Sequence, residues 1–217
     1  MTTDEDKGKS LLENAYRLAT PTDNIVYYKD FSSTYDRDFA DDLGFRLPYE
    51  VSRVFLARRP STVGPIADLG CGTGLVGQCL HPLAVDVDGL DISKDMLSVA
   101  MSKGVYRRLI ELDLTKSVGD LAYTYSAVLS SGTFTHGHLG PDAIDTAIKL
   151  GLDGCLFVVS INATHYKTQR FDTKLQTLLT DETIHDLRVE DVAIYSRADH
   201  DHSSDRALIV SFLKSEA

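Results

Sequence analysis

The sequence predicts an α/β protein built on a doubly wound, mostly parallel sheet. Three observations support this. From residue 65 onward, short apolar runs alternate with helical patterns. The first run leads into a glycine-rich turn, Gly70-Cys71-Gly72-Thr73-Gly74. The next two runs end in acids, Asp91 and Asp113. Glycines and acids at strand ends are typical of ligand sites at the carboxyl edge of such sheets.

The segment before residue 60 shows helical rather than strand patterns. Residues 1–9 are polar and charged, which predicts a disordered tail. Apolar residues three or four apart in residues 10–60 predict a helical lid, and residues 61–217 form the expected core. We expect the lid helices over residues 10–18, from the N-cap Asn24 onward, and over residues 43–58.

Strands and helices alternate through the core. Strands are expected over residues 65–69, 83–90, 105–112, 125–131, 155–161, 187–196 and 206–213. Helices are expected over residues 75–80, from the N-cap Ser93 to Met101, over residues 141–150 and over residues 171–179. Because no helix separates the last two strands, they can pair antiparallel. The pattern therefore suits seven strands with one antiparallel C-terminal strand.

Composition narrows the class of protein. The 217 residues carry a net charge of −10, which disfavours a nucleic-acid partner. The three cysteines form no CxxC pair and indicate a reducing compartment. No signal peptide or membrane-length apolar run occurs, so we expect a cytoplasmic protein without a membrane partner. Asp199-His200-Asp201-His202 is interpreted as a solvated loop, and no metal site is expected.

The glycine turn predicts a cofactor site. Residues 72–77 satisfy GxGxxG, and Asp91 lies about 20 residues further on, where an acid binds a ribose. This much fits both NAD(H) and S-adenosylmethionine. Asp68 favours the second, because a carboxylate repels a pyrophosphate but attracts an ammonium or a sulfonium. Asp113 can accept a hydrogen bond from an adenine amino group. A seven-stranded sheet with one reversed C-terminal strand also favours S-adenosylmethionine over NAD(H).

These motifs resemble a known family. Asp68–Gly74, Leu90–Ser93 and Leu112–Leu114 resemble the successive cofactor motifs of class I S-adenosylmethionine-dependent methyltransferases, and the resemblance extends over roughly residues 25–215. It implies a Rossmann-like seven-stranded sheet. Within the class, Tyr35–Ala40 with Leu43–Phe45, and Gly132–Pro141, resemble the Williams–Beuren-region methyltransferase-like group.

The resemblance also implies residue roles. The Gly70 carbonyl and the backbone at Cys71 and Gly72 line the methionine moiety, and Asp68 reaches its ammonium through water. Asp91 accepts from the ribose hydroxyls. The adenine contacts Ile92, Met96, Asp113 and the Leu114 N–H. Ser130, with Ser131, borders the sulfonium. Tyr28 or Tyr35 closes over the cofactor, and Tyr35 is favoured because the family carries a Tyr-Asp pair there.

Each role has a purely structural alternative. Asp68 can serve only to orient the turn, and Cys71 can be present for its small size. The aromatic stripe Tyr28, Phe31, Tyr35 and Phe39 is typical of core packing. The ligand role is better supported for Asp91, because it stands at a strand end.

The loop after the fourth strand carries the candidate catalytic residues. Methyl transfer to a hydroxyl or amine needs a base, and His136 or His138 could supply it near neutral pH. Ser130–Thr133 stands where methyltransferases of adenine or glutamine carry Asn-Pro-Pro-Tyr or Asp-Pro-Pro-Tyr, which favours a small-molecule O- or N-acceptor. Asn162, His165 and Tyr166 could line its pocket. An NAD-dependent oxidoreductase and a non-catalytic module remain the alternatives.

Overall fold

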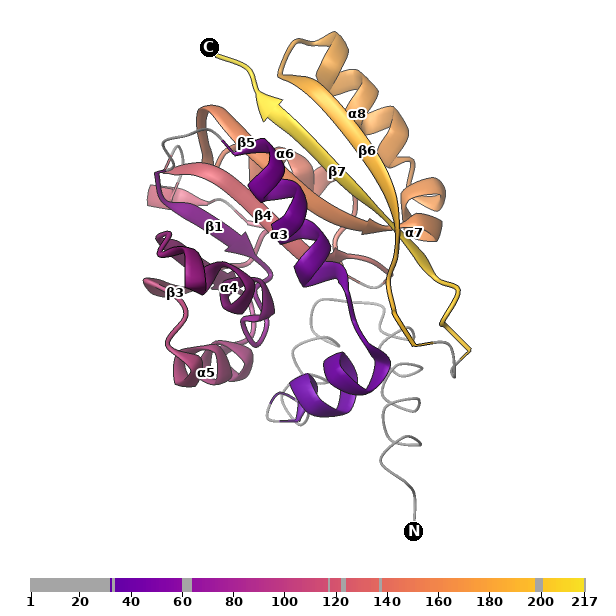
Figure 1. The fold of residues 1–217 in the computed structure, drawn as a ribbon. Coiled ribbons are helices and arrows are strands. Elements are labelled where there is room, and N and C mark those ends of the chain that lie inside the picture. The colour runs from indigo at the N-terminus through magenta and orange to yellow at the C-terminus, as the bar shows by residue number, and fades with distance from the viewer. Residues whose placement is uncertain are drawn as a thin grey trace.

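The computed structural model describes most of the chain (Figure 1). The helices expected over residues 10–18 and from Asn24 lie outside the described residues, as does Tyr28. The described residues are 32, 34–59, 64–116, 118–121, 124–136, 138–197 and 201–216.

A seven-stranded sheet forms the centre of the molecule, with strand order β3-β2-β1-β4-β5-β7-β6. Strands β1 to β5 pair in parallel, whereas β7 is antiparallel to both β5 and β6. The predicted Rossmann-like sheet with one antiparallel C-terminal strand is therefore confirmed. The strands are β1 Ile66–Leu69, β2 Val87–Asp91, β3 Arg108–Glu111, β4 Tyr125–Phe134, β5 Gly151–Asn162, β6 Ile184–Ala193 and β7 Arg206–Lys214.

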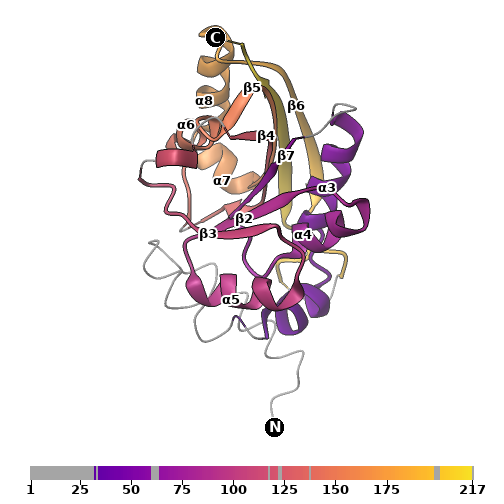
Figure 2. The same cartoon turned by 90° about the vertical axis from the view of Figure 1, so that its left-hand side faces the viewer.

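Helices cover both faces of the sheet, as Figure 2 shows. One face packs against α3 (Leu47–Arg58) and α4 (Leu75–Leu80), the other against α6 (Asp142–Ile148) and α8 (Phe171–Thr180). Helix α5 (Lys94–Lys103) packs on β2 and β3 at the sheet edge. The central strands are buried from both sides, which explains their continuous apolar runs.

Some element boundaries differ from the prediction. β2 begins at Val87 because residues 81–83 form a short 3-10 helix (η2), which ends where Ala84 adopts a φ of 53°. The short helix α7 (Ala163–Thr168) was not predicted. It begins where the Asn162 side chain accepts hydrogen bonds from Thr164 N and His165 N, which is an N-cap.

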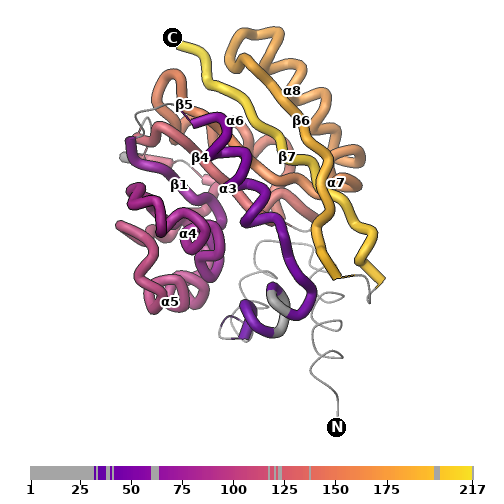
Figure 3. Tube along the Cα trace, in the orientation of Figure 1, coloured from indigo at the N-terminus to yellow at the C-terminus, as the bar shows by residue number. Residues whose placement is uncertain are grey.

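Helix α3 belongs to the sheet core, although it falls within the range expected as a lid. Its residues Leu47, Val51, Val54 and Phe55 are buried against the sheet. A short π-helix, η1 (Asp36–Asp41), precedes it, and in Figure 3 the chain runs from this turn directly into α3 across the sheet. Only the part of the expected lid before α3 therefore remains a candidate cover for a site.

Across the part of the chain that the structure describes, no helix is both long and apolar enough to span a bilayer.

Core membership of α3 can be tested with two neighbouring residues. Phe55→Ala removes a side chain with 0% exposure, and we expect the free energy of unfolding to fall by about 3–5 kcal/mol. Leu56→Ala is the matched control, because Leu56 is 39% exposed and its loss should cost less than about 1 kcal/mol. Urea unfolding measures both. Equal effects of the two substitutions would contradict the packing.

Candidate active site

A pocket lies at the carboxyl ends of the parallel strands, where the strand order reverses between β1 and β4. Ligands of doubly wound sheets bind at this switch point. The pocket brings together residues from the ends of β1 to β5. Of the residues predicted from the sequence, it is lined by Tyr35, Asp68, Gly70, Cys71, Gly72, Asp91, Ile92, Met96, Asp113, Leu114, His136 and His138.

The glycine turn is fastened to the neighbouring strand by its backbone. Gly70 N and Cys71 N both donate to Leu90 O, at 2.7 and 3.0 Å. Gly70 has a φ of +67°, and a Cβ there would meet Thr133 Oγ1 at 2.1 Å. Gly70 thus satisfies both a left-handed conformation and a close approach that other residues would not tolerate.

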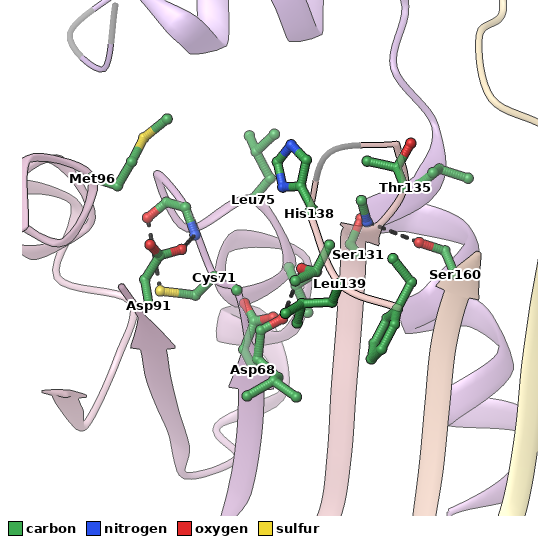
Figure 4. A pocket seen from close by; sticks show the side chains of 18 of the residues that line it. Asp68, Cys71, Leu75, Asp91, Met96, Ser131, Thr135, His138, Leu139 and Ser160 are labelled. Carbon is green, nitrogen blue, oxygen red and sulfur yellow. Dashed lines mark hydrogen bonds between the residues drawn. The ribbon is translucent and has the colours of Figure 1, made fainter. Parts of the chain in front are cut away.

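Asp91 closes the turn from the end of β2. Its carboxylate accepts from Gly72 N and Ser93 N, each at 2.8 Å, and Figure 4 shows the first of these bonds inside the pocket. Burial raises the pKa of Asp91 above its usual value, although these N–H donors favour the ionised form. The Asp91 side chain lines the pocket.

Asp68, at the carboxyl end of β1, is fully buried beside the turn. Tyr106 Oη donates to its Oδ2 at 2.5 Å, whereas Oδ1 is buried without a hydrogen-bond partner among the described residues. Burial, with a smaller contribution from the charge of Asp91, raises the pKa of Asp68 to about 7. A buried acceptor that lacks a donor is costly, so this atom suits a cationic or hydrogen-bonding ligand.

Asp113 follows β3 at the far end of the pocket. Its Oδ1 accepts from the backbone and hydroxyl of Thr115, and its Oδ2 lies 3.0 Å from Lys116 Nζ. The hydrogen bond from the Thr115 side chain holds the pKa of Asp113 below its usual value. Asp113 is therefore a carboxylate at neutral pH and can accept from a ligand. Leu114 is buried beside it.

Ser130 does not line the pocket, contrary to the prediction. It is fully buried, and its hydroxyl donates to Leu69 O at 2.7 Å. Side chains alternate along a strand, so Ser130 and Ser131 point to opposite sides of β4. Ser131 is the residue that reaches the pocket, and its Oγ is buried with no hydrogen-bond partner in the described part of the chain.

The loop after β4 brings both candidate catalytic histidines to the pocket. His165, on α7, lies behind this loop and not in the pocket; its Nε2–H donates to Leu139 O at 3.0 Å, and its ring centroid is 5.2 Å from that of His136. Burial lowers the pKa of His138 to about 4, with a smaller contribution from His165. Asn162 lines the pocket as proposed, whereas Tyr166 does not.

The segment before α3 contributes further residues that sequence reasoning missed. Asp36, beside Tyr35, accepts from Thr73 Oγ1 in the glycine turn and pairs with Lys103 at the end of α5. Phe45 and Tyr195 also line the pocket. They belong to segments about 150 residues apart that meet in an isolated β-bridge, so no local sequence pattern could reveal them.

The pocket fits S-adenosylmethionine on structural grounds. A Cβ added at Gly72 would meet nothing within 4 Å, so the turn presents bare backbone to the pocket. The buried Asp68 Oδ1 suits a cationic group, and Asp91 and Asp113 offer carboxylates to hydroxyl and amino groups. Among the described residues, no cluster of histidine, cysteine and acidic side chains could hold a metal ion. Asp199 and His200 of the loop discussed above lie outside the described residues.

The raised pKa of Asp68 predicts a pH-dependent stability of the ligand-free protein. Because the folded state favours the neutral carboxyl, its stabilising contribution is complete below about pH 4 and is lost as the pH rises through about 7. Relative to Asp68→Asn, the wild type should lose on the order of 4 kcal/mol across this interval. Urea unfolding at several pH values measures this. Parallel curves for the two proteins would contradict the shift, and Asp95→Asn serves as the control outside the pocket.

Comparisons with known proteins agree with this geometry. Residues 66–150 match the family model described as a methyltransferase domain. The putative methyltransferase YqeM of Bacillus subtilis is 34% identical over 78 residues, which are 36% of this chain and 30% of that protein. The chain thus matches less than a third of the length of this curated relative.

Solved structures share the fold at low sequence identity. A putative methyltransferase of Haloferax volcanii, in complex with the Trm112 activator, aligns with a TM-score of 0.61 and 15% identity, over 87% of this chain and 98% of that chain. Magnesium protoporphyrin IX methyltransferase of Synechocystis, with bound S-adenosylmethionine, aligns over 99% of both chains with a TM-score of 0.55 and 16% identity.

The family match covers β1 to the end of α6, which includes the glycine turn and all three acids of the pocket. The narrower resemblance to the Williams–Beuren-region group stays a prediction. Residues 66–150 belong to the methyltransferase domain family, and the fold that surrounds them is that of the class I S-adenosylmethionine-dependent methyltransferases.

Proposed function

We propose that this protein transfers a methyl group from S-adenosylmethionine to an oxygen or nitrogen atom of a small-molecule acceptor and releases S-adenosylhomocysteine. One observation carries the proposal. The pocket joins a bare glycine turn and three carboxylates, Asp68, Asp91 and Asp113, to a loop with two imidazoles. The carboxylates suit the cofactor, and the imidazoles suit an acceptor that must lose a proton.

The chain's own residues would hold the cofactor in a fixed orientation. Asp91 is oriented by Gly72 N and Ser93 N and would accept from the ribose hydroxyls. Asp113 would accept from the adenine amino group, with Ile92 and Met96 beside the ring. Asp68 would face the methionine ammonium. Tyr35, carried by the segment that Asp36 anchors to Thr73, would close over the site as the proposed lid.

When bound, the cofactor would supply an electrophilic methyl group to the lone pair of the acceptor, with the neutral thioether of S-adenosylhomocysteine as the leaving group. The proton released by the acceptor goes to an imidazole of the loop. His138 is a neutral imidazole at physiological pH, but its lowered pKa makes it a weak base. We therefore propose His136 as the base and His138 as a hydrogen-bonding residue.

Several features support a small acceptor over a nucleic acid. The net charge of −10 opposes a phosphate backbone. Ser130–Thr133 replaces the Pro-Pro-Tyr type of motif found where adenine or glutamine is methylated. The assignment of the acceptor to small molecules follows from these features together.

Calorimetric titration with S-adenosylhomocysteine tests the cofactor assignment. We expect micromolar binding to the wild type and a loss of about 100-fold in Asp91→Asn, because two backbone N–H groups and the ligand hydroxyls lose a charged acceptor. Glu111→Gln is the matched control: Glu111 pairs with Asp91 in the sheet register but is exposed and outside the pocket.

The same titration, together with an activity assay, separates the alternatives. Binding of NAD(H) in place of S-adenosylhomocysteine would overturn the proposal in favour of an oxidoreductase. Binding of S-adenosylhomocysteine without turnover across an acceptor panel would favour a non-catalytic module. Methylated product, detected by mass, would exclude the non-catalytic alternative.

The assignment of the base makes a second prediction. His136→Asn should lower kcat by about 10²–10⁴ and leave the affinity for S-adenosylhomocysteine unchanged, because it removes only the proton acceptor. His138→Asn should have a smaller effect. His185→Asn, on the exposed face of β6, is the control. Stopped assays across pH measure kcat, and full activity of the His136 variant would remove His136 from the mechanism.

A further inference from the structure

We propose that the acceptor is an uncharged molecule with a flat aromatic ring that carries the hydroxyl to be methylated. This inference rests on the proposed methyl transfer and adds the chemical class of the acceptor. It depends on four features of the pocket: where its charges lie, which aromatic side chains form its wall, which polar groups face it, and where these stand relative to the end of β4.

The charges of the pocket lie on one side. Among the described lining residues, the acidic side chains are Asp68, Asp91 and Asp113, at the ends of β1, β2 and β3. The other side is built from the ends of β4 and β5, the loop after β4, and the segments around Phe45 and Tyr195. Its described lining residues include no aspartate, glutamate, lysine or arginine. Figure 4 shows Asp91 and Met96 on one side and Ser131, Thr135 and Ser160 on the other.

An aromatic wall closes the uncharged side. Arg46 N donates to Ile194 O at 2.8 Å, and Ser196 N donates to Gly44 O at 2.9 Å, so the two segments form a short antiparallel bridge. This bridge sets Phe45 and Tyr195 side by side, with ring centroids 6.1 Å apart. Leu47, Pro48 and Ile194 extend the same apolar surface.

The wall stands over the end of β4, where the loop with the two histidines begins. A Cβ built on Gly132 would lie 3.4 Å from Phe45 Cζ, so the tip of this ring approaches the β4 backbone. An acceptor held against Phe45 would therefore lie next to the Asp68 turn on one side and the imidazole loop on the other. That is the place where an acceptor must meet a methyl group.

The polar groups on this side suit one hydroxyl. Ser160 Oγ accepts from Gly132 N at 2.8 Å, which leaves its own O–H to donate. Ser131 Oγ is buried in the described structure without a hydrogen-bond partner. Together with the loop imidazoles, these groups can donate to and accept from a single O–H group. The two serine hydroxyls carry no charge that could neutralise a carboxylate or an ammonium.

Physical chemistry then favours the aromatic alcohol. On this side of the pocket the described lining offers a charged acceptor no aspartate, glutamate, lysine or arginine to pair with, so its loss of hydration would be strongly unfavourable. A flat ring can pack against Phe45 and Tyr195 in the offset or edge-on arrangements that aromatic pairs prefer. A phenolic hydroxyl, with a pKa near that of tyrosine, about 10, also gives up its proton far more readily than an aliphatic hydroxyl.

Four matched probes test the acceptor class on the wild-type protein saturated with S-adenosylhomocysteine. 4-Ethylphenol is neutral and flat, tyramine adds an ammonium, 3-(4-hydroxyphenyl)propanoate adds a carboxylate, and 4-ethylcyclohexanol removes the flat ring. Binding is measured by saturation-transfer NMR, independently of turnover. We expect 4-ethylphenol to bind at least about tenfold more tightly than each of the other three. With S-adenosylmethionine, it should also give the methyl ether.

Two variants test the aromatic wall. Phe45→Leu and Tyr195→Leu should each weaken 4-ethylphenol binding about threefold to tenfold, because each removes one aromatic contact. Tyr49→Leu is the control, since Tyr49 is 59% exposed on α3 and outside the pocket. S-adenosylhomocysteine affinity, measured in parallel, reports whether each variant is folded.

The outcomes separate the two proposals. If the wild type does not bind S-adenosylhomocysteine, the proposed function fails before the acceptor is tested. If it binds, the acceptor inference is overturned by tyramine or the propanoate binding as tightly as 4-ethylphenol, by equal binding of the cyclohexanol, or by no binding of any probe. Unchanged 4-ethylphenol affinity in both leucine variants would also overturn it.

Discussion

The attachment of the turn after β1 to the end of β2 is the constraint on which the rest of the site depends. Leu90 O accepts from Gly70 N and Cys71 N, and the Asp91 carboxylate accepts from Gly72 N. These bonds hold three consecutive positions of the turn against β2 and point its bare backbone into the pocket. Asp91 also accepts from Ser93 N, so two of the acceptor positions of its carboxylate are occupied by backbone N–H groups of the protein.

Electrostatics gives this site a built-in preference for a positively charged ligand. Asp68 is fully buried, its pKa is raised to about 7, and the nearby charge of Asp91 contributes to that shift. Carboxyl groups at the neighbouring ends of β1 and β2 destabilise each other when both are ionised. A cation bound beside them would relieve that repulsion and supply a partner for Asp68 Oδ1. In the proposed function, relief of this unfavourable arrangement would contribute to the affinity for the cofactor.

Contacts between distant segments build the other half of the pocket. Asp36 ties the segment before α3 to the glycine turn and to Lys103, and the bridge between Phe45 and Tyr195 ties it to the end of β6. On the opposite side, His165 holds the histidine loop through Leu139 O. The side of the pocket that carries the carboxylates is therefore fixed by the sheet, whereas the opposite side is built by segments held together by contacts between distant parts of the chain.

The sequence alone was sufficient for the sheet and for most residues on the carboxylate side of the pocket, because those features are local. A glycine turn, an acid at a strand end and an apolar run are each visible within a few residues, and Asp68, Asp91 and Asp113 all reach the pocket as predicted. Tertiary structure decided the rest. Because side chains alternate along β4, Ser131 and not the predicted Ser130 reaches the pocket. Packing placed α3 in the core. Contacts between distant segments brought Phe45 next to Tyr195 and His165 next to Leu139. These features depend on which face of the sheet each strand residue occupies and on contacts between residues far apart in the sequence. No local sequence pattern contains that information.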